Sequence, residues 1–388
     1  MKTWKRTLAL LLSLALVISL CACGFTADPT GGTANPSPDA SLDPGAAPSI
    51  EVDLARNAVD FSAGLSPSEV LLTVNGEDVP AELFLYLLFW DCYYLQYNYY
   101  YYYGISVNLD ELSGALLDDT VDMLLHYTVL RQKALELGCP LTDEQQAELE
   151  AGKTGEEAER YEQNKAAFGL TDASMDFLAT LDYYHENLLE TVPMPARDEL
   201  DNYVYQTKHI LIKTVDGQNQ PLSGEEIAAQ KALAEDILAQ LRAVEGEERL
   251  ELFDELMNQY SEDGRDGNGD LYAPDGYEAV LGDMVPDYEQ GALALDFGEI
   301  SGLVESSYGY HIILRQEVQF RDGTAEEYAE AYREYLLDEQ MDQWTHDVEP
   351  VRTSALDALD VSGFYDRYFA YYNAVMEQYE AAGDDTAD

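Results

Sequence analysis

Two of the five histidines in the chain stand in short apolar runs that are typical of β-strands. His209 lies in "KHILIK", residues 208–213, and His311 lies in "YGYHIILR", residues 308–315. An imidazole can exchange a proton near neutral pH, bind a metal ion or hold a hydrogen bond. The pair therefore indicates a polar site, or two core histidines whose hydrogen bonds are satisfied within the fold.

Other chemistries that use histidine have little support in the sequence. A metal site needs a third ligand, and no tight ligand spacing or CxxC motif is present. Cys92 and Cys139 lack any surrounding nucleophile motif, so a Cys–His hydrolase is not indicated. The stretch "DGNGDLYAPDGYE" resembles a calcium loop but has no glycine at the sixth position, which favours a simple loop.

The two histidine strands enclose a segment with a mixed pattern. Between them, apolar residues recur at helical spacing in two runs, around residues 234–241 and 252–260. A Gly- and Asp-rich loop follows the second run. This order predicts a β-α-α-…-β module that spans residues 201–320.

The regions on both sides of this module read as helical. Residues 66–200 open with a predicted hairpin around Asn75-Gly76, and helices follow, one of them over 116–138. Thr142 and Gln145 form a capping-box pattern. Residues 321–378 predict further helices with unpartnered aromatic faces. We therefore expect an α+β protein in which the module is inserted into one all-helical domain built from both chain ends.

The N-terminus predicts a targeting segment. Residues 1–22 combine a basic start with an apolar run that ends in "LCACG", which resembles a bacterial lipobox. The resemblance implies cleavage before Cys23 and lipid attachment to its sulfur, so we expect a lipid anchor on the extracytoplasmic face of the membrane. Residues 23–65 have the composition of a disordered tether, and residues 379–388 form an acidic tail.

The formal net charge of −54 limits the partners of the chain. A field of this sign disfavours nucleic acids and other polyphosphates and is compatible with cations or basic polypeptides. The simpler interpretation is a solvated acidic surface that aids solubility. Cys92 and Cys139 are open to two interpretations, an extracytoplasmic disulfide or two buried free thiols.

The module resembles the parvulin-type peptidyl-prolyl cis/trans isomerases. The motifs that carry the resemblance are "KHILIK", "YSEDGRDGNGDL", "GDMVPDYEQGALALDFGEISGLV" and "VESSYGYHIILRQE", in this order. The resemblance implies catalytic roles for His209, Asp263 and His311, and places four residues against the substrate, Leu271, Met284, Tyr288 and Ser306. It implies neither a metal nor another cofactor.

Three departures from the family pattern bear on activity. Tyr288 stands where phenylalanine is usual, which predicts a hydroxyl at the rim of the proline pocket. Tyr272 stands where glycine is usual. The loop after the first strand has no arginine, and Lys213 lies only at its edge, so a phosphorylated substrate is not expected.

The helical region resembles, more weakly, the chaperone domains of secreted foldases of the PrsA and SurA type, in the stretch "LLTVNGEDVPAELFLYLL". The run "YYLQYNYYYYYG", residues 93–104, is open to two interpretations. It forms an aromatic surface for unfolded clients, or it packs on the aromatic C-terminal helix.

The predicted function is that of a membrane-anchored foldase that isomerises X-Pro bonds in exported, partly unfolded proteins. Two alternatives stay open, a chaperone whose module binds peptides without turnover and an acidic scaffold that buffers cations. The sequence leaves the client proteins and the oligomeric state open.

Overall fold

The computed structural model describes residues 50–321 and 323–384, which divide into two compact units. One unit comprises residues 192–336. The other comprises the described residues up to Thr191 together with those from Leu337 onward. The α+β fold class is therefore confirmed: a small module with an antiparallel sheet interrupts a mainly helical unit that both flanking regions build.

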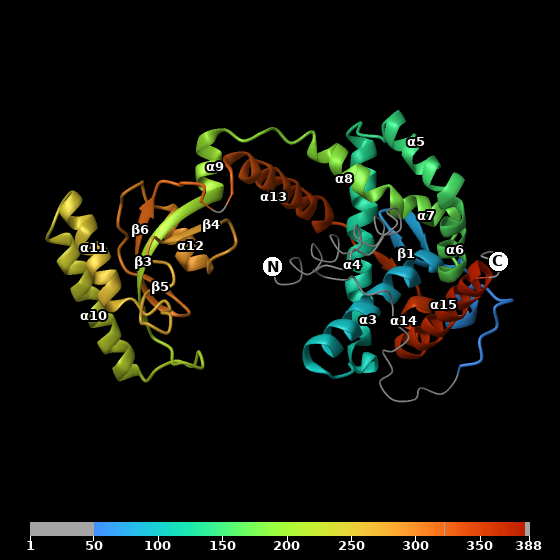
Figure 1. The fold of residues 1–388 in the computed structure, drawn as a ribbon, viewed down its shortest axis with the longest axis horizontal. Helices are drawn as coiled ribbons and strands as arrows, with labels where there is room; N and C mark the ends of the chain where they lie inside the picture. The colour runs from blue at the N-terminus through green and yellow to red at the C-terminus, as the bar shows by residue number, and fades with distance from the viewer. Residues whose placement is uncertain (1–49, 322, 385–388) are drawn as a thin grey trace. The chain divides into compact units, whose positions relative to one another are not determined.

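The 192–336 unit contains a four-stranded antiparallel sheet of strand order β4-β3-β6-β5. Its elements are α9 (Arg197–Tyr203), β3 (Val204–Lys213), α10 (Gly224–Arg242), α11 (Glu247–Tyr260), β4 (Tyr277–Val280), α12 (Pro286–Leu293), β5 (Val304–Ser306), β6 (Gly309–Gln316) and the first part of α13 (Ala325–His346). Helices α10 and α11 lie on one face of the sheet and α12 lies on the other (Figure 1).

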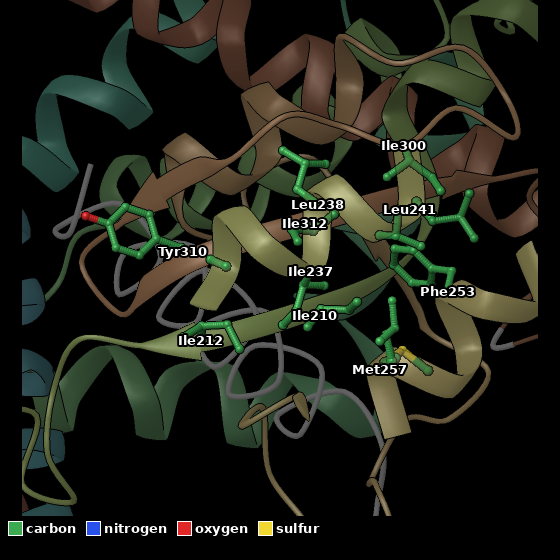
Figure 2. Close-up of a cluster of buried hydrophobic side chains, with 13 residues drawn as sticks. Ile210, Ile212, Ile237, Leu238, Leu241, Phe253, Met257, Ile300, Tyr310 and Ile312 are labelled. Carbon is green, nitrogen blue, oxygen red and sulfur yellow. The ribbon is translucent and has the colours of Figure 1, made fainter. Parts of the chain in front are cut away.

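The main core of this unit lies between the sheet and α10 and α11. Ile210 and Ile312, both fully buried, point from the central strands toward Ile237 of α10 and Phe253 of α11 (Figure 2). Because side chains of a strand alternate between faces, the residues on either side of these isoleucines point to the opposite face. His209 and His311 occupy such positions.

The other unit consists of helices and one small sheet. Its elements are α2 (Ala58–Ala63), β1 (Val70–Val74), β2 (Glu77–Pro80), α3 (Ala81–Tyr103), α4 (Leu109–Glu136), α5 (Asp143–Gly152), the 3₁₀ helix η1 (Gly155–Glu157), α6 (Ala158–Phe168), α7 (Asp172–Ala179), α8 (Leu181–Leu189), the rest of α13, β7 (Val351–Arg352), α14 (Ser354–Asp357) and α15 (Val361–Asp384). The predicted hairpin is β1-β2, with Asn75 and Gly76 both at positive φ in its turn. β7 from the C-terminal region adds a third strand that the sequence did not predict, so this unit is not entirely helical.

The two chain ends meet through aromatic packing. Helix α15 packs against α2, α3, α4 and α6. Phe89 of α3 stacks on Tyr365 and Phe369 of α15, with ring centroids 5.7 and 6.3 Å apart. The C-terminal aromatic residues therefore bury the excess apolar surface of the N-terminal helices, as their composition indicates.

Three details differ from the sequence predictions. The first part of α13 packs within the 192–336 unit, because Tyr332 meets Tyr203 at a ring distance of 4.8 Å. Helix α4 begins at Leu109 instead of near residue 116, because Asn108 caps it. Cys92 and Cys139 are free thiols, and only Cys92 is buried.

The predicted signal segment, Cys23 and most of the predicted tether lie outside the described residues. Within residues 50–321 and 323–384, the helices lack the combination of length and apolar character that a membrane span requires.

Candidate active site

The site is built on the free edge of β3. Strand β4 pairs with β3 only over residues 204–207, so the backbone groups further along β3 need other partners. Leu211 N donates to Ser261 Oγ at 3.2 Å, and Glu262 N donates to Leu211 O at 2.9 Å. These contacts fasten the start of the loop after α11 to the strand, and they bring the next residue, Asp263, beside His209.

Asp263 is the centre of a short polar row. His209 Nε2 lies 2.9 Å from Asp263 Oδ2, and Tyr277 Oη donates to the same oxygen at 2.6 Å. Burial acts to raise the pKa of Asp263, but its two partners outweigh burial, and the pKa lies below the ordinary value. Asp263 is therefore ionised at neutral pH, and its carboxylate faces His209 Nε2 at ion-pair distance. The ring N–H of His209 is not aimed at this oxygen in the hydrogen-bond geometry, so the contact is electrostatic.

Tyr277 reaches Asp263 because of the local backbone. It is the first residue of β4 and pairs with Thr207. Gly276 before it has φ +84°, and a Cβ there would lie 2.2 Å from Thr207 O. Only glycine allows this approach without a rearrangement. Burial, followed by the hydrogen bond to Asp263, raises the pKa of Tyr277, so the hydroxyl keeps its proton.

A small cleft opens in front of this row. It encloses about 230 Å³, including space open to solvent, and its wall combines polar and apolar groups. The lining residues are His209, Met257, Ser261, Asp263, Gly264, Leu271, Ala273, Gly276 and Tyr277. The cleft is therefore a shallow one that mixes apolar side chains with the polar row.

His311 lies next to His209 on the same face of the sheet. The two imidazole rings are 5.3 Å apart, and Leu211 pairs with His311 across the strands. His311 Nε2 lies 2.7 Å from Ser306 Oγ. Among the described residues, neither ring nitrogen of His209 has a hydrogen-bond partner, nor has Nδ1 of His311, so the two imidazoles are not hydrogen-bonded to each other. Burial, followed by the neighbouring His209, lowers the pKa of His311 to about 3, so His311 is neutral at physiological pH.

Tyr288 lies beneath the two histidines. Its ring contacts His209 and His311 edge to face, at 5.0 and 5.1 Å. Its hydroxyl shares a 2.8 Å hydrogen bond with the hydroxyl of Thr207 and is buried, instead of standing at a pocket rim as the sequence suggested. The extra oxygen of tyrosine is thus accommodated by a partner within the fold.

The predicted substrate-binding residues fall into two groups. Leu271 lines the cleft with His209 and Asp263. Met284 is partly buried and packs with Tyr288 in the cluster beneath the sheet, and neither of them lines the cleft. Ser306 lies behind His311 and contacts its ring nitrogen. Tyr272 is largely exposed and packs on Gly264 at the edge of the cleft.

Two residues of the site were missed in the sequence. Tyr277 and Thr207 lie outside the motifs that point to the histidines, and their roles depend on the pairing of β4 with β3. The one available signal for Thr207 was its position two residues before His209 in the same strand, which places both side chains on the same face of the sheet.

The described residues hold no group of three or more His, Cys, Asp or Glu side chains arranged to bind a metal ion. In the Gly/Asp loop, Asp266 accepts hydrogen bonds from the backbone N–H groups of Asn268 and Asp270, at 2.8 and 2.9 Å. Its carboxylate thus stabilises the turn.

Comparison with known proteins identifies the module. Residues 209–317 match the family model described as a PPIC-type PPIase (rotamase) domain. The chain is 33% identical to the foldase protein PrsA of Halalkalibacterium halodurans over 173 residues, which are 42% of this chain and 47% of the relative. It is 33% identical to the chaperone SurA of Chromohalobacter salexigens over 150 residues, 37% of this chain and 30% of the relative.

Among solved structures, the peptidylprolyl isomerase PrsA of Bacillus cereus is 20% identical, with a TM-score of 0.33, and covers 78% of this chain and 99% of its own. The chain spans less than half the length of the two curated relatives. Residues 209–317 therefore form a PPIC-type PPIase domain, and the resemblance of the chain to the parvulin-type isomerases and to foldases of the PrsA and SurA type is confirmed.

Proposed function

We propose that this chain is an extracytoplasmic foldase that catalyses cis/trans isomerisation of X-Pro bonds in exported, partly unfolded proteins. The observation that carries the proposal is the carboxylate of Asp263, whose Oδ2 lies 2.9 Å from His209 Nε2 and accepts a hydrogen bond from Tyr277 Oη beside a small cleft. The PPIC-type domain and the foldase and chaperone names of the relatives support it.

The proposed reaction makes and breaks no covalent bond, so the protein needs no nucleophile. Rotation about the amide bond must overcome a barrier of about 18–20 kcal/mol because resonance is lost in the twisted state. The planar amide is more polar than the twisted one, so an apolar site favours the twisted form over both planar forms. Met257, Leu271 and Ala273 provide such a wall for the proline ring.

The polar row then faces the carbonyl side of the substrate bond. In this proposal His209 and Asp263 contact the amide region, while Tyr277 fixes the orientation of Asp263. In this proposal His311 acts as a neutral group next to His209, and Ser306 orients its ring. Tyr288 and Met284 support the histidines from below.

A refolding assay tests the foldase proposal. Refolding of an unfolded client whose slow phase is limited by proline isomerisation takes about 10–100 s at 25 °C, and the full chain should shorten it. Asp263→Ala should remove most of the acceleration. Asp275→Ala is the matched control, because Asp275 is an exposed carboxylate in the loop that leads to Gly276. Equal acceleration by both variants would contradict the proposed site.

We further propose that the chain is anchored through lipid on Cys23. The sequence pattern around Cys23 supports this assignment. Cys23→Ala should shift the protein from the membrane fraction to the soluble fraction of a bacterial host and abolish incorporation of a labelled fatty acid. Retention of the label in the variant would exclude Cys23 as the attachment site.

A chaperone without turnover is the second candidate. The exposed ring of Tyr272, which packs on Gly264 at the edge of the cleft, favours it, because a side chain there narrows access to the polar row. If the chain suppresses aggregation of a client but leaves the slow refolding phase unchanged, this candidate replaces the isomerase.

A further inference from the structure

The C-terminal end of α3 carries five consecutive exposed tyrosines, Tyr99 to Tyr103, which we call the tyrosine patch. The exposed fraction rises from 40% at Tyr99 to 70% at Tyr103, whereas the first half of the same helix is buried. Consecutive residues point around a helix, so one neighbouring element cannot cover all five rings. Grouped exposed apolar side chains of this size mark interaction sites.

One ring of the patch, that of Tyr101, belongs to an aromatic ladder along α3. Tyr93, Tyr97 and Tyr101 follow one another at one-turn intervals, with near-parallel rings 6.3 and 5.9 Å apart. Tyr93 at the base is buried against Phe369 of α15. The ladder thus runs from the core to the surface, and Tyr101 is its exposed end. A partner that binds Tyr101 meets a ring that is already stacked and loses little conformational entropy.

The chain segment that carries the patch is acidic. Residues 57–130 contain no Lys or Arg, so Asp and Glu carry all the formal charge at neutral pH around α3 and most of α4. Gln96 exchanges two hydrogen bonds with the backbone of Val107, at 2.8 and 3.0 Å, which holds the α3–α4 connection against α3. The first turn of α4, with Asp110 and Glu111, begins directly after it.

We propose that the tyrosine patch binds extended, Lys- and Arg-rich segments of unfolded polypeptides. The inference rests on the proposed foldase function and names the class of client segment that the helical unit selects. Guanidinium and ammonium groups are attracted to the faces of tyrosine rings, and the nearby carboxylates attract the same groups at longer range. The net charge of −54 disfavours a second copy of this chain as the occupant.

Binding of short unstructured peptides to the full chain tests the proposal. Three dye-labelled peptides of equal length, all without proline, would carry Lys and Arg, Glu, or only uncharged polar residues between the same apolar positions. The absence of proline separates this binding from the isomerase cleft. Fluorescence anisotropy should show binding of the basic peptide about tenfold or more tighter than that of the other two, and weaker binding at high salt.

Variants then assign the binding to the patch. Replacing Tyr101, Tyr102 and Tyr103 by Ser should weaken binding of the basic peptide about tenfold, whereas replacing them by Phe should retain most of it, since the ring face is kept. Leu135→Ser with Leu137→Ser is the matched control, because it removes exposed apolar side chains elsewhere in the same unit and should leave binding unchanged. Asp110→Asn with Glu111→Gln should weaken binding by a few-fold.

Several results would overturn the proposal. Equal affinity for all three peptides, or unchanged affinity in the Ser variant, would show that the patch does not select basic segments. A change of oligomeric state in the Ser variant, measured by sedimentation, would make the patch an interface between copies of the chain. If these tests fail while the refolding assay still shows acceleration, the inference falls and the proposed foldase function stands. If the chain binds the basic peptide selectively but neither accelerates refolding nor suppresses aggregation, the proposed foldase function falls and the binding of basic segments by the patch stands.

Discussion

The two faces of the sheet in the 192–336 unit use neighbouring residues of the same strands for different purposes. Ile210 and Ile312 point to the face that α10 and α11 cover, where the packing is apolar. His209 and His311, one residue before each, point to the face of α12, where imidazole, hydroxyl and carboxylate groups meet. The two imidazoles thus point away from the core under α10 and α11, although Met257 of that core also lines the cleft.

The largest effect is expected on the apolar face. Ile312→Ala leaves a cavity beneath α10 and should lower the free energy of unfolding of this unit by about 2–5 kcal/mol. Urea unfolding, followed by the methyl NMR signals of the unit, measures this loss. Ile105→Ala removes an exposed isoleucine and is the control. A loss below about 1 kcal/mol at Ile312 would show that the core does not depend on this face.

Acid should lower the stability of the 192–336 unit through His311, which lies on the other face of the sheet. The pKa of His311 is near 3 in the folded state and near 6.5 in the unfolded chain, so the unfolded state binds the extra proton between these values. Stability of the unit should therefore be full above pH 6.5 and fall as the pH drops toward 3, by up to about 1.4 kcal/mol per pH unit.

Unfolding in urea at pH 7 and pH 5 measures this dependence. His311→Gln should reduce the difference between the two conditions, whereas Ile312→Ala should lower stability equally at both. If His311→Gln leaves the acid sensitivity unchanged, His311 is not its source.

A smaller effect is expected from the hydroxyl that holds Asp263. Tyr277→Phe removes one hydrogen bond to the carboxylate, which should raise the pKa of Asp263 and lower isomerase activity about two- to tenfold, in line with ~0.5–1.5 kcal/mol per hydrogen bond. Carboxyl carbon NMR reports the titration of Asp263. Tyr272→Phe, at an exposed ring near the same cleft, should change neither quantity.

The smallest effect concerns the hydrogen bond between Tyr288 and Thr207. Tyr288→Phe leaves the Thr207 hydroxyl buried without this partner and should cost about 1 kcal/mol of stability. Because this hydroxyl lies away from the cleft, isomerase activity should stay within about twofold of the wild type. A larger loss of activity would place Tyr288 in contact with the substrate after all.

The sequence predicted the two histidine strands, the N-terminal hairpin and the two helices of the module, because alternation and helical spacing are local signals. It also predicted that both chain ends build one unit. It did not predict β4 and β5, which are only four and three residues long. It could not predict Tyr277, which depends on the register of β4 against β3, or β7, a two-residue strand whose partner lies far away in the sequence.

The run of tyrosines after Tyr93 shows a different limit. The sequence left two interpretations open, an exposed surface for clients and packing on the C-terminal helix. In the structure each holds for some of the tyrosines. Tyr93 packs against the C-terminal helix, while Tyr101 and its neighbours are exposed. A run of one residue type carries no information on where burial ends along the helix.

The most direct test of the account compares two adjacent residues on opposite faces. NMR exchange spectroscopy on a short Xaa-Pro peptide measures the isomerisation rate with the wild type, His209→Gln and Ile210→Val, each first shown to be folded. We expect the wild type to accelerate exchange, His209→Gln to lose about tenfold or more of that acceleration, and Ile210→Val to retain it. Full activity in a folded His209→Gln variant would contradict the assignment of the chemistry to this face of the sheet.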